Sequence, residues 1–353
     1  MRITRRDFLK YCTIAAGALG LTAIDLLKME KALALPGGLK VIWLNGQACT
    51  GCTVSLANSS YYTTLQDLTL GNPIGSGASE TLDIAFIETL SGITGDQIGT
   101  QIEAAAAGGF ALVIEGAMPT GDAKFCEIGE NWWSGSGTVT IANAVKHYAA
   151  LANCAAVIPV GTCACYGGIP AAFPNPTTSK GFLQLIKDDL STATYRAIRN
   201  KTINVPGCPP NPNWIVGTIA FLLANNLQQF PSCDALKRPR TYYGERICNN
   251  CDRFNNAADN FVGVTGFGGG GMTVVAPNDI GDPAHNSPGN WCLKKVGCKG
   301  SRTKSDCSLR KWHTSVPGSL ATGVNWCVGA GAPCQGCTQD KFPDGMSPFH
   351  YIR

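Results

Sequence analysis

Cysteine is the residue type that most constrains what this chain can fold into. The sequence has 17 cysteines and only four histidines in 353 residues. Six of the cysteines form three Cys-x-x-Cys pairs, at Cys49, Cys248 and Cys334. This spacing lets two sulfurs bind one metal centre from a single turn, and thiolates are soft, anionic ligands that suit iron. One pair alone is weak evidence, whereas three pairs with further single cysteines favour metal clusters.

The first 34 residues have three features of an export signal, in the expected order. Thr4-Arg5-Arg6-Asp7-Phe8-Leu9-Lys10 is similar to the twin-arginine consensus, a modest apolar run follows from Tyr11 to Leu27, and Ala32-Leu33-Ala34 suits cleavage. Disulfides are the usual reading of an exported cysteine-rich chain. The twin-arginine route carries folded proteins, often with a cofactor inserted in the reducing cytoplasm, so metal clusters are the stronger reading.

Charge and hydropathy exclude some partners. Residues 1–34 contain six of the 28 basic and three of the 24 acidic residues, which leaves 22 and 21 in the exported chain. This balance gives no reason to expect nucleic acid or a membrane surface as a partner. No later apolar run reaches the length of about 20 residues that a membrane-spanning helix needs, so no membrane span is expected after export.

From Gly38 to about Leu236 the pattern is α/β. Short apolar runs predict four buried strands, and helical stretches lie between or after them, such as 101–108 and 181–200. The strands are 40–45, 82–87, 110–114 and 155–160. Strands that alternate with helices indicate an open parallel sheet.

Cysteines follow the predicted strands of this first half. Cys49 and Cys52 come after the first strand, Cys163 follows Val160-Gly-Thr, and Cys208 follows Ile203-Asn-Val-Pro-Gly. Open α/β sheets bind ligands outside the carboxyl ends of their strands. The four cysteines could therefore meet at one place, and Glu115 ends another of the predicted strands.

From about Lys237 the strand and helix patterns fade. Glycine, lysine and cysteine dominate, and eight cysteines fall between Cys248 and Cys337. Such a segment buries too little apolar surface to offset its ordering entropy, so metal cross-links are a physical way to hold it. The run Gly266–Gly271 formally matches G-x-G-x-x-G but lacks a following helix, which indicates a loop.

Seven motifs accompany the twin-arginine signal along the chain. They are Cys49-Thr-Gly-Cys52-Thr-Val-Ser-Leu, Glu115-Gly-Ala-Met-Pro-Thr, Gly161-Thr-Cys-Ala-Cys-Tyr-Gly-Gly-Ile-Pro-Ala-Ala, Pro206-Gly-Cys-Pro-Pro-Asn-Pro, Tyr243-Gly, Gly297-Cys-Lys-Gly and Pro343-Asp-Gly-Met-Ser-Pro-Phe. In this order, and over nearly the whole length, the chain resembles the small, electron-transferring subunit of periplasmic nickel–iron hydrogenases. The resemblance implies a flavodoxin-like open parallel sheet (35–236, after the signal 1–34) and an irregular, iron–sulfur-cluster-rich C-terminal domain (237–353).

The resemblance also implies three iron–sulfur clusters in a line. The proximal set would be Cys49, Cys52, Cys163 and Cys208, and the distal set Cys248, Cys251, Cys292 and Cys298. The medial set would be Cys307, Cys334 and Cys337, with Cys327 deciding its type. The family has proline at that position in most members and a [3Fe-4S] cluster there; cysteine resembles the nickel–iron–selenium and some other branches, with a [4Fe-4S] cluster.

We therefore expect three all-cysteine [4Fe-4S] clusters, with a [3Fe-4S] medial cluster if Cys327 is not a ligand. At Cys248 most of the family has histidine. A thiolate in place of a neutral imidazole adds negative charge and should lower the potential of the distal cluster. Some oxygen-tolerant members carry two extra cysteines where this chain has Gly51 and Gly168, so an ordinary proximal cluster is expected.

For several residues the sequence allows two interpretations. The basic residues from Lys294 to Lys311, seven against the single acid Asp306, could compensate buried clusters or form a docking face for an acidic redox partner. Glu115 could be held by backbone donors or lie near the proximal cluster and the subunit interface. Cys165, with Cys126, Cys154 and Cys233, is expected to be a packed or free thiol. All four histidines are expected to be structural or on the surface.

The expected function is electron transfer within a hydrogenase. A separate large subunit would hold the nickel–iron site, and this chain, without nickel or any catalytic residue, would relay electrons to an external carrier. The absence of an anchor favours a periplasmic multihaem c-type cytochrome as that carrier. A stand-alone multi-cluster carrier is the alternative. Nickel on this chain is disfavoured because Thr338-Gln339-Asp340 replaces the histidine expected after a catalytic Cys-x-x-Cys pair.

Overall fold

The computed structural model describes residues 39–59, 82–93, 95–133, 137–225, 227–251, 253, 292–312 and 325–347. The expected export signal, the loop 266–271 and three of the histidines (His285, His313 and His350) lie outside these residues. Among the described residues, no helix is long and apolar enough to cross a bilayer.

A four-stranded parallel sheet forms the centre of the first half. Its strands are β1 (Leu39–Asn45), β2 (Leu82–Ile87), β3 (Phe110–Glu115) and β6 (Cys154–Val160), in the order β2-β1-β3-β6. Single parallel bridges from Val157 to Thr202 and from Val160 to Val205 continue the sheet beyond β6. This is the flavodoxin-like strand order, which confirms the expected open α/β sheet.

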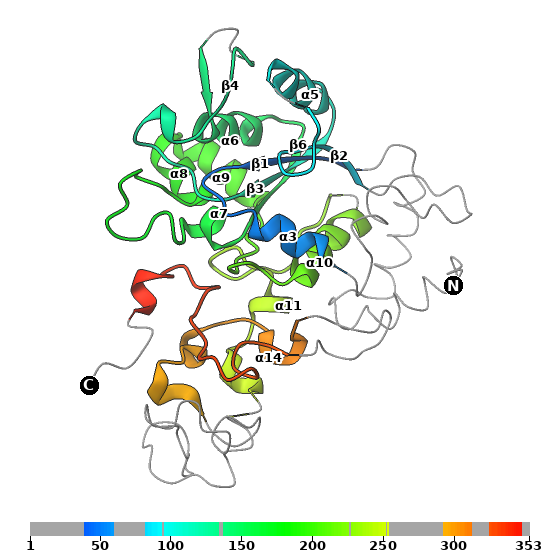
Figure 1. The fold of residues 1–353 in the computed structure, drawn as a ribbon. Helices are drawn as coiled ribbons and strands as arrows, with labels where there is room; N and C mark the ends of the chain where they lie inside the picture. Colours follow the sequence, from blue (N-terminus) through cyan, green and yellow to red (C-terminus); the bar gives the residue numbers. More distant parts are fainter. Residues whose placement is uncertain are drawn as a thin grey trace.

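Both faces of the sheet are buried, as its continuous apolar strands predicted. Alternate residues point to opposite faces: Ile42 and Leu44 pack into one core cluster, and Val41 and Trp43 into another. The first cluster lies under α5 (Asp96–Ala106), α6 (Ile141–Ala150), α8 (Phe182–Asp189) and α9 (Thr192–Asn200), and the second lies against α3 (Gly51–Ala57) and α10 (Pro212–Ala224) (Figure 1).

The predicted helical stretch 181–200 is two helices. Leu190 is extended, and the Ser191 hydroxyl accepts a hydrogen bond from the Thr194 amide at 3.2 Å, which caps the start of α9. A serine at this position satisfies an amide that the helix itself leaves unpaired, so it begins a new helix. A short hairpin of β4 (Glu127–Glu130) and β5 (Thr138–Thr140) precedes α6.

The described C-terminal segments have little regular structure, as expected. They contain single turns: α11 (Arg240–Tyr243), η2 (Ile247–Asn250), η5 (Leu293–Val296), η6 (Gly300–Arg302), α14 (Cys307–Arg310) and η7 (Asp344–Met346). A small apolar cluster, which includes Ile247, Trp326 and Val328, holds cysteines among its members. These segments lie below α3, α10 and the sheet in Figure 1.

Candidate metal centres

The carboxyl ends of the parallel strands bring the proximal set together. Cys49 and Cys52 lie around the start of α3, Cys163 lies in α7 (Thr162–Tyr166) after β6, and Cys208 follows the bridge at Val205. Burial, together with the neighbouring Cys208 and Cys49, raises the pKa of Cys163 to about 12. Because each thiol acts on its neighbours, these four cysteines from separate strand ends share one site.

Glu115, at the end of β3, is buried directly beside this site. Its carboxylate accepts hydrogen bonds from the Cys52 amide (2.9 Å), from the Thr53 amide (3.2 Å) and hydroxyl (2.5 Å), and from Trp43 Nε1 (3.3 Å). Both expected readings of Glu115 therefore apply in part: backbone donors hold it, and it lies next to a proximal cysteine. It supplies the cap that α3 lacks, since Thr50 makes no side-chain cap.

The medial set gathers in the C-terminal segments. Burial raises the pKa of Cys307 well above its usual value, and Cys337 and Cys334 both contribute. The Ser305 hydroxyl donates to Cys307 Sγ at 3.1 Å. Cys327 contributes to the raised pKa of Cys337 and also to that of Cys298, so it lies near one medial and one distal cysteine.

The distal set also gathers within the described residues. Burial, together with the neighbouring Cys298, Cys251 and Cys292, raises the pKa of Cys248 to about 12. Gly300 lies against two of them: a Cβ added there would come within 3.2 Å of Cys248 Sγ and 3.6 Å of Cys298 Sγ. Cysteines of each assigned set thus act on one another, and Cys327 and Cys334 also lie near distal Cys298, so the division into three sets of four stays a prediction.

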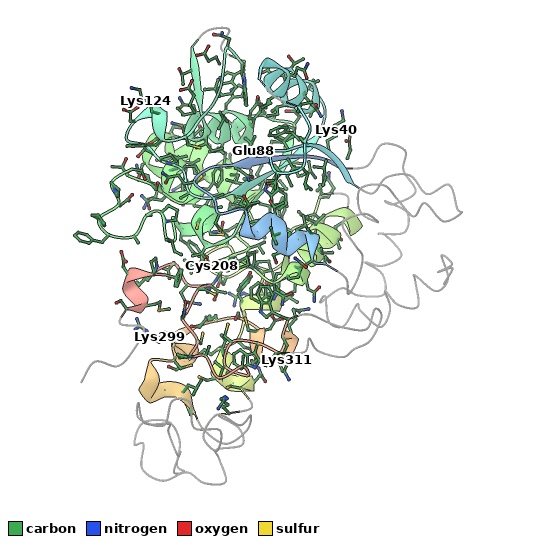
Figure 2. The ribbon with its side chains drawn as sticks, in the orientation of Figure 1. Lys40, Glu88, Lys124, Cys208, Lys299 and Lys311 are labelled. Carbon is green, nitrogen blue, oxygen red and sulfur yellow. The ribbon has the colours of Figure 1, made fainter. Side chains whose placement is uncertain are left out.

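Neighbouring sets touch through hydrogen bonds. The amide of medial Cys334 donates to Sγ of distal Cys298 at 3.3 Å. Burial raises the pKa of medial Cys337 to about 12, and a hydrogen bond from the backbone of proximal Cys208 opposes this rise. Figure 2 shows Cys208 where the sheet domain meets the C-terminal segments, with Lys299 and Lys311 on the C-terminal side. The medial set therefore lies between the other two.

The chemistry of these residues fits iron–sulfur clusters. None of the sixteen described cysteines forms a disulfide, although they lie in groups. Backbone amides donate to several of the thiols, for example that of Ile169 to Cys163 and that of Gly300 to Cys298. Hydrogen bonds to sulfur are among the features that set the potential of such clusters.

The described side chains do not converge as ligands of a single metal ion would. No three His, Cys, Asp or Glu side chains in the described part of the chain meet at one point.

One buried cation beside the distal set was not anticipated. Arg253 is only 2% exposed, interacts electrostatically with Cys251, Cys292 and Cys298, and donates from Nε to the Val328 carbonyl at 2.8 Å. Its positive charge opposes the negative charge that Cys248 adds. The only sequence signal for this arginine is its position two residues after a predicted ligand, and nothing in the sequence indicates that it is buried.

The basic residues from Lys294 to Lys311 lie in different environments. Arg310 pairs with Asp306 at 2.7 Å and lies over the Tyr242 ring, and Lys299 is 9% exposed. Among the described basic side chains of this run, Arg302 alone is exposed. Lys299, which lies beside Cys298, agrees with the compensation of buried clusters, whereas Arg310 compensates Asp306, and neither is exposed as a docking face would require.

The four spare thiols each donate to a backbone carbonyl. Cys165 is buried and donates to Pro159 O at 3.2 Å, and Cys126, Cys154 and Cys233 contact the carbonyls of Asn45, Ala156 and Pro231. These contacts agree with the packed-thiol reading. His147 stacks on Trp133 with ring centroids 4.2 Å apart, which is a structural role.

Two family models match the chain. Residues 49–222 match the model described as NADH ubiquinone oxidoreductase, 20 Kd subunit. Residues 276–350 match the model of the C-terminal part of the NiFe/NiFeSe hydrogenase small subunit.

Curated relatives and solved structures agree with these matches. The chain is 32% identical to the periplasmic [NiFe] hydrogenase small subunit of Solidesulfovibrio fructosivorans, over 99% of this chain and 93% of that one. It is 31% identical to the periplasmic [NiFeSe] hydrogenase small subunit of Desulfomicrobium baculatum, over 99% of both chains. Its fold matches a structure of the reduced, active Ni-Fe-Se hydrogenase from that organism with a TM-score of 0.68, covering 90% of this chain and 100% of that one at 31% identity.

Proposed function

The chain belongs to the family of nickel–iron and nickel–iron–selenium hydrogenase small subunits, and on that premise we propose that its three sets of cysteines hold three [4Fe-4S] clusters that relay electrons. The chain is the electron-transfer subunit of a hydrogenase, an enzyme of hydrogen oxidation or proton reduction. Each cluster, when bound, takes up and gives back one electron. The grouping of twelve cysteines in a proximal, medial and distal order supports this proposal above any other observation.

The residues of this chain supply the ligands and their surroundings. Four thiolates in each set would bind iron, and amide and hydroxyl donors such as Ser305 would hold the sulfurs in place. We propose the division into 35–236 with the proximal set and 237–353 with the medial and distal sets. Neither nickel nor a general acid or base is assigned to this chain.

We propose that a large subunit with the nickel–iron site covers the proximal set. Cys49 and Cys208 are exposed in this chain, and Val54 (53% exposed) and Ile169 (57%) add apolar surface beside them. The amide of Ile169 bonds to Cys163, so that surface adjoins the set. Exposed cluster ligands with apolar neighbours suit a partner surface better than water.

The test of this function is co-purification. The tagged chain should bring down a nickel-containing partner, and hydrogen should reduce the iron–sulfur clusters of the complex. Clusters present without nickel or a partner would instead favour the stand-alone carrier. A chain without iron or labile sulfide would contradict both functions.

For the external carrier we propose a periplasmic multihaem c-type cytochrome, reached after export by the signal in residues 1–34. Two relatives named periplasmic support this location. Replacement of Arg5 and Arg6 by lysine should leave the chain in the cytoplasm. Unchanged export of this variant would contradict the twin-arginine route.

We propose a four-iron medial cluster with Cys327 as its fourth ligand. The oxidised protein should then lack the nearly isotropic EPR signal of a [3Fe-4S] cluster, and Cys327→Pro should acquire it. A three-iron signal at full stoichiometry in the unchanged protein would show that Cys327 is not a ligand.

A further inference from the structure

Thr162 joins three segments that carry predicted cluster ligands. It is the first residue of α7, directly before proximal Cys163, and is 1% exposed. Its hydroxyl donates to the carbonyl of medial Cys337, which lies 175 residues away in the chain. The same hydroxyl accepts a hydrogen bond at 3.0 Å from the amide of Gly207, the neighbour of proximal Cys208.

The contacts of Thr162 with Gly207 run in both directions. The Thr162 amide donates to the Gly207 carbonyl at 2.9 Å, so the loop that carries Cys208 is fixed to the start of α7. The hydroxyl uses its single proton toward Cys337 and accepts from Gly207. One side chain thus links two proximal ligands to one medial ligand.

Thr162 lies beside a place where the proximal and medial sets are neighbours. Proximal Cys208 and medial Cys337 are neighbours, since the backbone of Cys208 is among the groups that act on the pKa of the Cys337 thiol. Between the next two sets, the Cys334 amide donates to Cys298 Sγ at 3.3 Å. The Thr162 hydroxyl holds both partners of the first contact, through Gly207 and through the Cys337 carbonyl.

We propose that Thr162 is a positioning residue for electron transfer between the proximal and medial sites. The inference rests on the proposed function. In the step concerned, one electron leaves the proximal site, which is oxidised by one, and enters the medial site, which is reduced by one. No bond forms or breaks and no proton moves, so the rate depends on how closely the two sets are held.

A hydroxyl is required because the position needs one donor and one acceptor at the same atom. Valine has nearly the same shape but would leave the buried Gly207 amide and the Cys337 carbonyl without their partner. The backbone bond from residue 162 to Gly207 would remain, but the link from the hydroxyl to the Cys337 segment would be lost. Serine keeps the hydroxyl and both hydrogen bonds.

The test compares Thr162→Val and Thr162→Ser in the intact heterodimer. Samples are mixed with hydrogen and frozen after increasing times, and EPR follows the reduced proximal and medial sites in each sample. We expect Thr162→Val to delay the medial signal relative to the proximal one about tenfold, which corresponds to about 1.4 kcal/mol of barrier. Thr162→Ser should stay within about twofold of the unchanged protein.

Thr202→Val is the matched control. Thr202 is fully buried, and its hydroxyl donates to the Ile198 carbonyl at 2.8 Å, away from every predicted ligand. The Thr202→Val variant should lose a buried hydroxyl hydrogen bond without delaying the medial signal. The spin–spin splitting between the two reduced sites should weaken in Thr162→Val alone, since it reports their separation.

The outcomes separate this inference from the proposed function. A Thr162→Val heterodimer with full sulfide content and an undelayed medial signal would overturn the role of Thr162 and leave the function intact. If Thr162→Val fails to assemble, Thr162→Ser decides, because a delay in that variant would show that the hydroxyl is not what matters. Absence of labile sulfide from the unchanged protein would instead overturn the proposed function.

Discussion

At the scale of single residues, burial sets the chemistry of the thiols. Burial is the largest cause that raises the pKa of Cys248 to about 12 and that of Cys292 to about 11. Such thiols are protonated at neutral pH without a metal, so iron must displace their protons. Burial keeps these thiols protonated and unreactive when no metal is bound. The positive charge of iron would stabilise their thiolates and so allow them to hold a cluster.

Gly168 shows how tightly the proximal set is enclosed. Its φ is +52°, and a Cβ there would come within 2.9 Å of Cys163 Sγ, Cα and N. At Gly51 the corresponding distance to Cys49 Sγ is 3.1 Å. Both positions, where oxygen-tolerant relatives were expected to carry cysteines, therefore adjoin proximal sulfurs.

Gly168→Ala should displace Cys163 and lose the proximal cluster. Labile sulfide should fall by about four per chain, the content of one [4Fe-4S] cluster. Gly95→Ala is the control, because Gly95 has a similar φ of +60° but nothing within 4 Å of the added Cβ. It should show only the backbone strain of about 1–2 kcal/mol and keep its sulfide. Full sulfide in Gly168→Ala would contradict the close fit.

At the scale of elements, β3 and α3 depend on each other. Glu115 ends β3 and accepts from two amides in the first turn of α3, where a helix leaves its amides unpaired. A negative carboxylate is also favoured at a helix N-terminus. This cap between elements fixes the start of α3, and with it Cys52.

Glu115→Gln should destabilise the protein. The side-chain amide of glutamine would point an N–H donor at groups that are themselves donors to Glu115, so one of them would lose its acceptor. The cost of leaving a buried donor unpaired is about 1–3 kcal/mol. Glu127→Gln, on the exposed face of β4, should change stability by no more than about 0.5 kcal/mol. Thermal unfolding of the two variants checks this, and equal midpoints would show that Glu115 is no cap.

The strands could be predicted from sequence because a parallel sheet buried on both faces gives continuous apolar runs. All four were predicted to within one residue. The break between α8 and α9 was missed because its cause is one capping serine, Ser191. Thr162 and Arg253 were missed because their partners lie 175 and 75 residues away in the chain and are backbone carbonyls, which leave no pattern.

At the scale of the whole molecule, a buried arginine at the predicted domain boundary contacts residues on both sides of that boundary. Arg238, 2% exposed, pairs with Asp234 at 2.7 Å and donates to the Thr338 carbonyl at 3.0 Å, next to medial Cys337. Trp214 of α10 likewise donates to Asp306, the neighbour of medial Cys307. The ligand sets stay a prediction from the resemblance, whereas these connections could be found only in the structure.

Arg238→Met should lower the unfolding temperature of the heterodimer well below that of Lys146→Met. Removal of one partner of a fully buried pair costs about 3–5 kcal/mol, and here the loss should be below that range, because Asp234 is partly exposed and keeps the backbone donors of residues 236 and 238. Lys146 forms a more exposed pair with Asp189, worth about 0–1 kcal/mol. Similar losses in both variants would contradict a structural role for Arg238 at this junction.

The most direct test of the three-cluster relay is labile sulfide per small subunit, combined with EPR of the oxidised protein. Three [4Fe-4S] clusters predict about twelve sulfides per chain and no three-iron signal. About twelve sulfides with a full three-iron signal would contradict the four-ligand medial site. About eight sulfides or fewer in freshly purified, fully assembled heterodimer would contradict the relay of three clusters.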